Sequence, residues 1–205
     1  MNTPSRTGLL VTLLTATGVA NADWSANLGF ASEYYYRGIF QESTSANGGI
    51  DFDTGGFYVG TWTADVGDGL EVDGYFGYGF NLGDVDLSVG YTGYFYTGDF
   101  DDTYQEINLG AGFGLLTLDV AIGKYANFDG PTQDYTFYSL MLEKNGFYGK
   151  FGGFAQDFEG EYFEAGYGTT IAEVDLALSL IISNEKLVGA NDEAIVFTLS
   201  KSFDL

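Results

Sequence analysis

Polar and apolar side chains alternate with a period of two from Trp24 to the end of the chain, and this alternation most constrains the fold. Successive side chains of a β-strand point to opposite faces, so the alternation predicts strands with one apolar and one polar face. It predicts twelve strands, with ten as the alternative count, and the first is one long strand over residues 24–37. In the third strand, residues 57–64, aromatic residues occur at both parities and leave its orientation open.

The connections between these strands alternate between short and long. Short turns containing Gly, Asn or Thr fall near residues 54–56, 81–83, 112–114, 145–146 and 170–171. Longer polar connections fall at residues 38–44, 65–69, 97–102, 126–133, 155–160 and 184–192. Outer-membrane barrels have this asymmetry, with short periplasmic turns, longer external loops and an even number of strands. The pattern therefore predicts an all-β fold, an antiparallel up-and-down transmembrane β-barrel. A soluble lipocalin-like carrier is the alternative, although it has no physical reason to sort its loops.

Aromatic residues on the apolar faces support the barrel, because aromatic rings collect where hydrocarbon meets the headgroups. Near the short turns we expect a girdle of Trp24, Phe52, Phe80, Phe113, Phe147 and Phe203. At the opposite end the candidates are Tyr34, Tyr36, Tyr91 and Phe95. A closed sheet also pairs every backbone amide and carbonyl within the lipid, which an open sheet cannot do.

The N-terminus has the three regions of a secretory signal peptide. Arg6 precedes an uncharged, largely apolar run over residues 8–20, and Ala20-Asn21-Ala22 supplies a cleavage site. The apolar run is too short to cross a bilayer as a helix. We therefore expect a signal peptide over residues 1–22, a barrel domain over residues 23–205, and export to the outer membrane of a Gram-negative bacterium.

The composition excludes several classes of function. The chain has no Cys and no His, so it lacks disulfides, thiolate nucleophiles and the usual zinc ligands. Its net charge of −22 disfavours nucleic acid as a partner. We expect no enzyme, no cofactor and no bound metal, although a two-carboxylate hydrolase using Glu71 and Asp73 stays formally open.

Four blocks between Ser32 and Tyr78 resemble the TorF family of proteobacterial exported proteins, which are named as porins. The blocks are SEYYYRGIFQ at 32–41, GGIDFD at 48–53, GFYVGTW at 56–62 and EVDGYFGY at 71–78. A closing FTLSKSF at 197–203 adds a weaker likeness, although Asp204 and Leu205 follow where such chains often end on the aromatic residue. The resemblance implies an outer-membrane location and a pore, and it brings no catalytic residues.

The polar faces predict an acidic barrel interior. The acidic residues expected to line the pore are Glu33, Asp51, Asp53, Glu71, Asp73, Asp84, Asp86, Glu106, Asp119, Glu143, Glu164 and Asp175. Seven of them, the predicted acidic collar, fall near the short turns: Asp51, Asp53, Asp84, Asp86, Asp119, Glu143 and Asp175. The expected inward cations are Arg37, in a local ion pair with Glu33, and Lys150. Rings of carboxylates favour cations in a pore, whereas Asp beside a turn also simply accepts backbone hydrogen bonds.

Two functions fit this interior. The first is a porin that forms a narrow, cation-preferring channel for small hydrophilic solutes. The second is a closed barrel filled by its own tyrosines, with a binding or structural role through its acidic external loops. The inward tyrosines that would narrow or fill the lumen are Tyr35, Tyr75, Tyr94, Tyr96, Tyr104, Tyr125, Tyr135, Tyr148 and Tyr162.

The acidic external loops suggest partners at the cell surface. Residues 99–102 and 157–161 are rich in carboxylates, which are ligands for Ca²⁺ or Mg²⁺, but neither has an EF-hand spacing, and solvated loops are the simpler interpretation. Divalent ions bridging these loops to lipopolysaccharide would be consistent with an outer-membrane barrel. The expected partners are membrane lipid, lipopolysaccharide and small solutes or cations, with association into a homo-oligomer left open.

Overall fold

The computed structural model describes residues 22–205, so the predicted signal peptide lies outside the described residues except for Ala22. The division into a signal peptide and a barrel domain stays a prediction. No helix between residues 22 and 205 is both long and apolar enough to cross a membrane.

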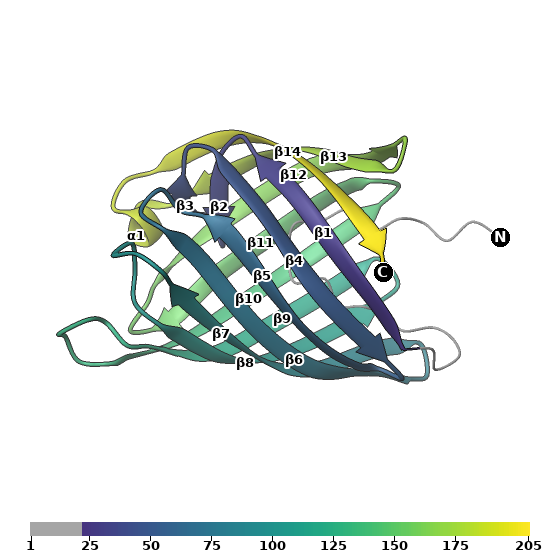
Figure 1. The fold of residues 1–205 in the computed structure, drawn as a ribbon. Helices are drawn as coiled ribbons and strands as arrows, with labels where there is room; N and C mark the ends of the chain where they lie inside the picture. The colour runs from purple at the N-terminus through teal and green to yellow at the C-terminus, as the bar shows by residue number, and fades with distance from the viewer. Residues whose placement is uncertain (1–21) are drawn as a thin grey trace.

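Twelve antiparallel strands close into a barrel, which confirms the predicted fold class and strand count (Figure 1). Neighbours in the barrel follow one another along the chain, and β14 closes it by pairing with β1. The barrel strands are β1 (Asp23–Ala31), β4 (Ser45–Thr54), β5 (Phe57–Asp65), β6 (Leu70–Leu82), β7 (Val85–Tyr96), β8 (Tyr104–Phe113), β9 (Leu116–Tyr125), β10 (Gln133–Lys144), β11 (Phe147–Gln156), β12 (Gly160–Ile171), β13 (Val174–Ser183) and β14 (Asp192–Asp204). Two further elements are not part of the barrel wall: a hairpin, β2 (Tyr34–Tyr36) and β3 (Ile39–Glu42), and a short helix, α1 (Glu185–Val188).

The outer surface of the barrel is apolar because the alternation along each strand sends the large apolar side chains outward. Large exposed side chains include Phe76, Leu109, Ile122, Leu140 and Leu178. The described residues that are buried instead point inward, and many of them are polar or aromatic. A surface of this kind suits lipid as its solvent, and the closed hydrogen-bonded sheet leaves no unpaired edge within it.

The orientation of β5, which the sequence leaves open, follows from the exposure of its side chains. Phe57 and Val59 are exposed on the outer surface. Trp62 points inward, and its ring meets the ring of Tyr34 edge-on at 5.9 Å between centroids. The indole of Trp62 therefore faces the lumen, where it packs against the ring of Tyr34.

The two ends of the barrel differ as predicted. At the short-turn end, tight turns join strand pairs; Asn145 and Gly146 have φ of 54° and 82°, as a type I′ turn requires. Both termini of the barrel lie at this end, since Trp24 pairs with Phe52 and Ser25 with Asp204. At the long-loop end, longer segments join the strands, and α1 and the β2–β3 hairpin belong to them (Figure 1).

Aromatic rings gather near the short-turn end. Trp24, Phe80, Phe113, Phe147 and Phe203 are exposed there. Phe52 is partly covered because its ring centroid lies 5.0 Å from that of Trp24. The expected girdle at this end is therefore present.

The first strand departs from the prediction, because β1 ends at Ala31 and residues 34–36 belong to the separate β2–β3 hairpin. At the break, Ser32 N donates to the carbonyl of Phe197 at 2.8 Å, and the Ser32 hydroxyl accepts from Phe197 N at 2.9 Å. Tyr34 and Tyr36, predicted for the outer girdle, are inside instead. Their hydroxyls find hydrogen-bond partners on the inner wall, which lipid would not supply.

Candidate functional site: the lumen and its inward hairpin

The β2–β3 hairpin crosses the lumen at the long-loop end and touches opposite walls of the barrel. The Tyr34 hydroxyl donates to Glu71 on β6 at 2.8 Å. The Tyr35 hydroxyl donates to Asp192 on β14, also at 2.8 Å. Burial raises the pKa of Tyr35, and the Asp192 carboxylate adds to that rise, so this hydroxyl keeps its proton. Because three strands separate β6 from β14 around the barrel, these bonds fix the hairpin to two separate parts of the wall.

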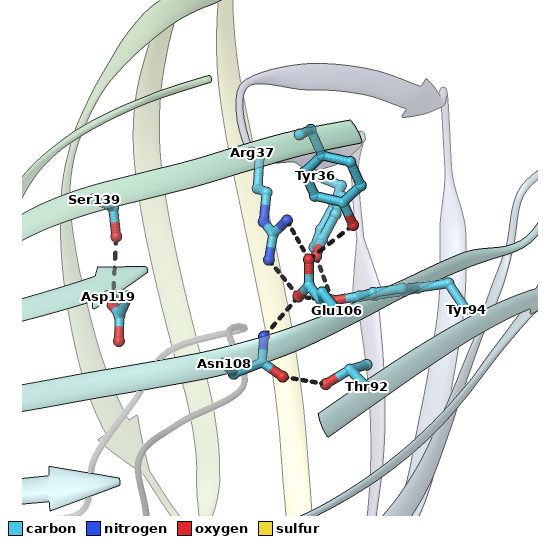
Figure 2. Close-up of polar contacts among 9 residues, drawn as sticks. Tyr36, Arg37, Thr92, Tyr94, Glu106, Asn108, Asp119 and Ser139 are labelled. Atoms are coloured by element: carbon cyan, nitrogen blue, oxygen red, sulfur yellow. Dashed lines mark hydrogen bonds and ion pairs between the residues drawn. The ribbon is translucent and has the colours of Figure 1, made fainter. Parts of the chain in front are cut away.

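The tip of the hairpin ends in a two-pronged ion pair, shown in Figure 2. Arg37 Nη1 donates to Glu106 Oε2 at 2.8 Å, and Arg37 Nη2 donates to Oε1 at 2.7 Å. The side chain of Arg37 is 10% exposed and that of Glu106 is fully buried. Bidentate pairing fixes both position and orientation, so this contact holds the tip of the hairpin against β8. The predicted local pair between Arg37 and Glu33 is wrong.

The Glu106 carboxylate collects further donors from the barrel wall. Tyr94 and Asn108 donate to Oε1, each at 2.7 Å, and Tyr135 donates to Oε2 at 2.9 Å. The Tyr36 hydroxyl lies 2.6 Å from that of Tyr94, which links the hairpin to this network (Figure 2). Every oxygen of the carboxylate therefore has at least two donors, which is what a buried charge requires.

Aromatic side chains fill the lumen around the hairpin. The Arg37 guanidinium lies 4.2 Å from the Phe137 ring centroid, a cation–π distance. The Gly38 carbonyl accepts a hydrogen bond from the Ser183 hydroxyl at 2.5 Å. The buried cluster at this level contains Ala121, Tyr125, Tyr135, Phe137, Phe154, Tyr162, Ile181, Ala194 and Val196, with Tyr35, Ile39, Tyr104, Phe158 and Leu187 packed against it. The long-loop half of the lumen is thus closely packed.

The half of the lumen nearer the short turns is polar, and it contains both half-buried and buried polar side chains. Asp51 accepts from the Tyr75 hydroxyl at 2.5 Å, and Asp119 accepts from the Ser139 hydroxyl at 3.3 Å. Both carboxylates are only half-buried. Lys150 is 3% exposed, and its ammonium lies 5.8 Å from the Tyr162 ring centroid. Water and small ions therefore have polar partners on this side of the hairpin.

The strand register shows where the sequence-predicted acids lie. Those on the face opposite the exposed apolar side chains are Asp51, Asp53, Glu71, Asp73, Asp86, Glu106, Asp119, Glu143, Glu164 and Asp175. Glu33 differs, because it lies between β1 and β2 rather than on a strand. Asp84 lies within the turn between β6 and β7 and is exposed, and Glu143 is exposed at the short-turn rim. Whether these carboxylates line a conducting pore stays a prediction.

Sequence reasoning missed the polar residues that complete the network. Asn108 bridges Glu106 and the Thr92 hydroxyl, which donates to Asn108 Oδ1 at 2.9 Å. Their positions on inward parities were the available signal, but uncharged amides and hydroxyls are common on any polar face.

The acidic loops use many of their carboxylates internally. Asp101 accepts from the hydroxyls of Tyr104 and Tyr125, at 2.8 and 2.7 Å. Asp102 accepts from the amide of Phe128 at 2.6 Å, and Asp157 from that of Asp134 at 2.8 Å. Within residues 22–205 no group of three or more Asp, Glu, His or Cys side chains is arranged to hold a metal ion.

A closed barrel with an apolar outer surface, a polar interior and a folded-in hairpin defines this molecule as a transmembrane β-barrel protein. More specifically, the chain belongs to the Gcw_chp family, described as a bacterial protein of unknown function, whose model matches residues 15–194. The resemblance to the TorF family stays a prediction. No curated protein matches the chain.

Solved structures share the fold at low sequence identity. One, from work on the mechanism of in-meso crystallization of membrane proteins, has a TM-score of 0.60 at 10% identity, covering 89% of this chain and 84% of that chain. The COG4313 outer membrane channel from Pseudomonas putida F1 has a TM-score of 0.53 at 11% identity, covering 96% of this chain and 100% of that chain. These likenesses show the barrel architecture.

Proposed function

We propose that this protein is an outer-membrane porin forming a narrow, cation-preferring channel for small hydrophilic solutes, with the β2–β3 hairpin as its constriction. The observation that carries the proposal is the polar lumen below the hairpin, where several carboxylate side chains are only half-buried. Carboxylates such as Asp51, Asp119 and Glu164 face this space inside a barrel whose outer surface is apolar. A polar interior within a lipid-facing wall is the arrangement of a water-filled channel.

Cation preference is supported by the balance of charges on the inner wall. The inward cations are Arg37 and Lys150, and Arg37 is already neutralised by Glu106. The remaining inward acids outnumber Lys150, so the lumen carries an excess of negative charge. Negative rings attract cations and repel anions.

The outer membrane is the proposed location, with the short-turn end facing the periplasm. The apolar outer surface, the girdle at the short-turn end and the predicted signal peptide support it. Lipid and lipopolysaccharide are the proposed neighbours, and assembly into a homo-oligomer stays a prediction. We propose no catalytic activity, because the Glu71 carboxylate already accepts from Tyr34 and Tyr96 beneath the hairpin.

A second candidate is the closed barrel with a binding or structural role. The close packing of the long-loop half favours it, since Tyr135 and Tyr162 are each only 2% exposed beside the hairpin. Under this alternative the hairpin is a permanent plug, and the exposed loops carry the function.

Planar-bilayer recording of residues 23–205, refolded in detergent and measured under a KCl gradient, separates the two candidates. Discrete conductance steps with a reversal potential shifted toward that of K⁺ are expected for the channel. A barrel that folds and inserts but gives no steps would rule the channel out and support the plugged alternative. Migration of the unheated sample in a denaturing gel, which differs between folded and unfolded barrels, confirms that the protein is folded.

A further inference from the structure

The Asp73 carboxylate is buried in the lumen without a partner for one of its oxygens. The residue is 6% exposed, and Oδ1 has no hydrogen-bond donor among residues 22–205. None of the ion pairs formed in that range includes Asp73. A buried carboxylate that lacks both a donor and a counter-charge is unfavourable, so Asp73 either keeps its proton or binds a cationic donor.

The neighbouring buried carboxylates differ from Asp73 because they have hydrogen-bond donors or a counter-charge. Glu71 accepts from Tyr34 at 2.8 Å and from Tyr96 at 3.4 Å. Glu106 is paired with Arg37. Glu71, Asp73 and Glu106 are therefore three buried acids beside a single guanidinium, that of Arg37. Among these three, Asp73 is the one with a carboxylate oxygen that lacks a donor.

Aromatic side chains flank Asp73 on both neighbouring strands. Asp73 is directly opposite Trp62 on β5 and Tyr94 on β7. Residues directly opposite one another share a face of the sheet, so both side chains lie on the lumen side with the carboxylate. Electron-rich rings beside a carboxylate favour a bound cation over a neutral donor.

We propose that Asp73 binds the primary ammonium group of a small solute. Such a group supplies both the missing positive charge and several N–H donors. A metal ion fits less well, because no group of three acidic or other ligating side chains within residues 22–205 is arranged to hold one. The site rests on the proposed function and names the class of cation that the channel selects.

The polar side of the lumen gives the solute a route to Asp73. Two residues along β6 toward the short turns, Tyr75 is partly exposed and donates to the half-buried Asp51. A solute that enters from the short-turn end would therefore meet polar side chains before Asp73 and would not have to pass the hairpin.

Trp62 supplies a reporter, because the chain has only two tryptophans and Trp24 lies on the outer surface. In the refolded W24F protein, titration with methylammonium chloride should give a saturable change in Trp62 fluorescence. Tetramethylammonium chloride, which has the same charge but no N–H donor, should give none. Asp73→Asn should weaken the response at least about tenfold, as expected for a hydrogen bond between charged groups. The matched control, Asp99→Asn, removes the same charge from an exposed loop and should leave the response unchanged.

Equal responses to the two ammonium salts, or none to either, would overturn the site even if D73N failed to fold. The fluorescence result is independent of the planar-bilayer recording. If the barrel conducts but gives no fluorescence response to methylammonium, the Asp73 site alone is ruled out. If the barrel does not conduct but does give the response, the site is retained and the channel is ruled out.

Discussion

Arg37 adopts a backbone φ of 51°, a left-handed conformation that is unfavourable for a residue with a Cβ atom. The next residue, Gly38, continues the left-handed turn with a φ of 79°. The strained tip is compensated by the bidentate pair with Glu106 and by the Phe137 ring beneath the guanidinium. One residue thus closes the hairpin and fastens it to the far wall.

Removing the partner of Arg37 should release the hairpin. Glu106→Gln leaves the guanidinium buried and uncompensated, and breaking a buried pair in this way costs about 3–5 kcal/mol. Trypsin cleaves after Arg and Lys, and Arg37 is 10% exposed in the docked hairpin. Cleavage after Arg37 should therefore speed up by about 100-fold or more, measured by mass spectrometry of the released peptide.

The matched control for this prediction is Glu173→Gln, which removes the exposed pair between Glu173 and Lys201. Exposed pairs contribute about 0–1 kcal/mol, so cleavage after Arg37 should stay near the wild-type rate. Equal cleavage of E106Q and E173Q would show that the ion pair does not hold the hairpin.

Gly38→Ala should displace the tip of the hairpin from the lumen. An added Cβ would lie 2.5 Å from Tyr162 Cγ, and the φ of 79° is itself unfavourable for Ala. The expected result is a larger single-channel conductance than in the wild-type protein. Gly55→Ala is the control, since Gly55 has a φ of 57° but nothing within 4 Å of the added atom. If both variants conduct alike, the contact with Tyr162 has no part in the constriction.

At the scale of elements, the β2–β3 hairpin is an insertion between two strands that already meet. Ala31 at the end of β1 pairs with Ser45 at the start of β4. A short Asn-Gly turn therefore suffices to join these strands once residues 32–44 are removed. This deletion should leave a closed barrel with a conductance several times larger.

Planar-bilayer recording measures this effect, and gel migration of the unheated deletion variant checks that the barrel still forms. A folded deletion variant with wild-type conductance would mean that the aromatic cluster of the wall, rather than the hairpin, limits the pore.

The barrel strands could be predicted from the sequence because their signal is local. Alternation and turn residues mark strands such as β6 and β13 without reference to the rest of the chain. The hairpin could not be predicted, because residues 32–36 continue the alternation of β1. The contacts that turn these residues into the lumen are distant in sequence. Tyr34 donates to Glu71, 37 residues away, and Arg37 donates to Glu106, 69 residues away. Gly38 indicated a turn after Arg37, but it did not indicate that the hairpin folds into the lumen.

Across the whole molecule, charge is distributed unequally along the barrel axis. The cations of the lumen, Arg37 and Lys150, lie at or below the hairpin, whereas several carboxylates of the predicted collar lie toward the short-turn rim. A solute entering from that rim meets negative charge first and the aromatic constriction second. Under the proposed channel function, selection by charge and selection by size would therefore take place at different depths of the lumen.

The predicted collar should govern charge selectivity. Changing Asp51, Asp84 and Asp119 together to Asn should move the reversal potential toward zero under a KCl gradient, because carboxylates in the wall attract K⁺. Asp51 and Asp119 are half-buried and Asp84 is exposed, so the two half-buried positions should account for most of the shift. The variant Asp84→Asn alone tests this division.

Salt concentration provides the complementary test of the same charges. The Debye length falls from about 10 Å at 0.1 M to about 3 Å at 1 M. If selectivity arises from charges spread around the wall, the K⁺ preference of the wild-type protein should be strong near 0.1 M and largely lost near 1 M. A preference that persists at 1 M in the wild type and in the triple variant would instead place selectivity at a closely fitting site, such as Asp73, where screening by salt has little access.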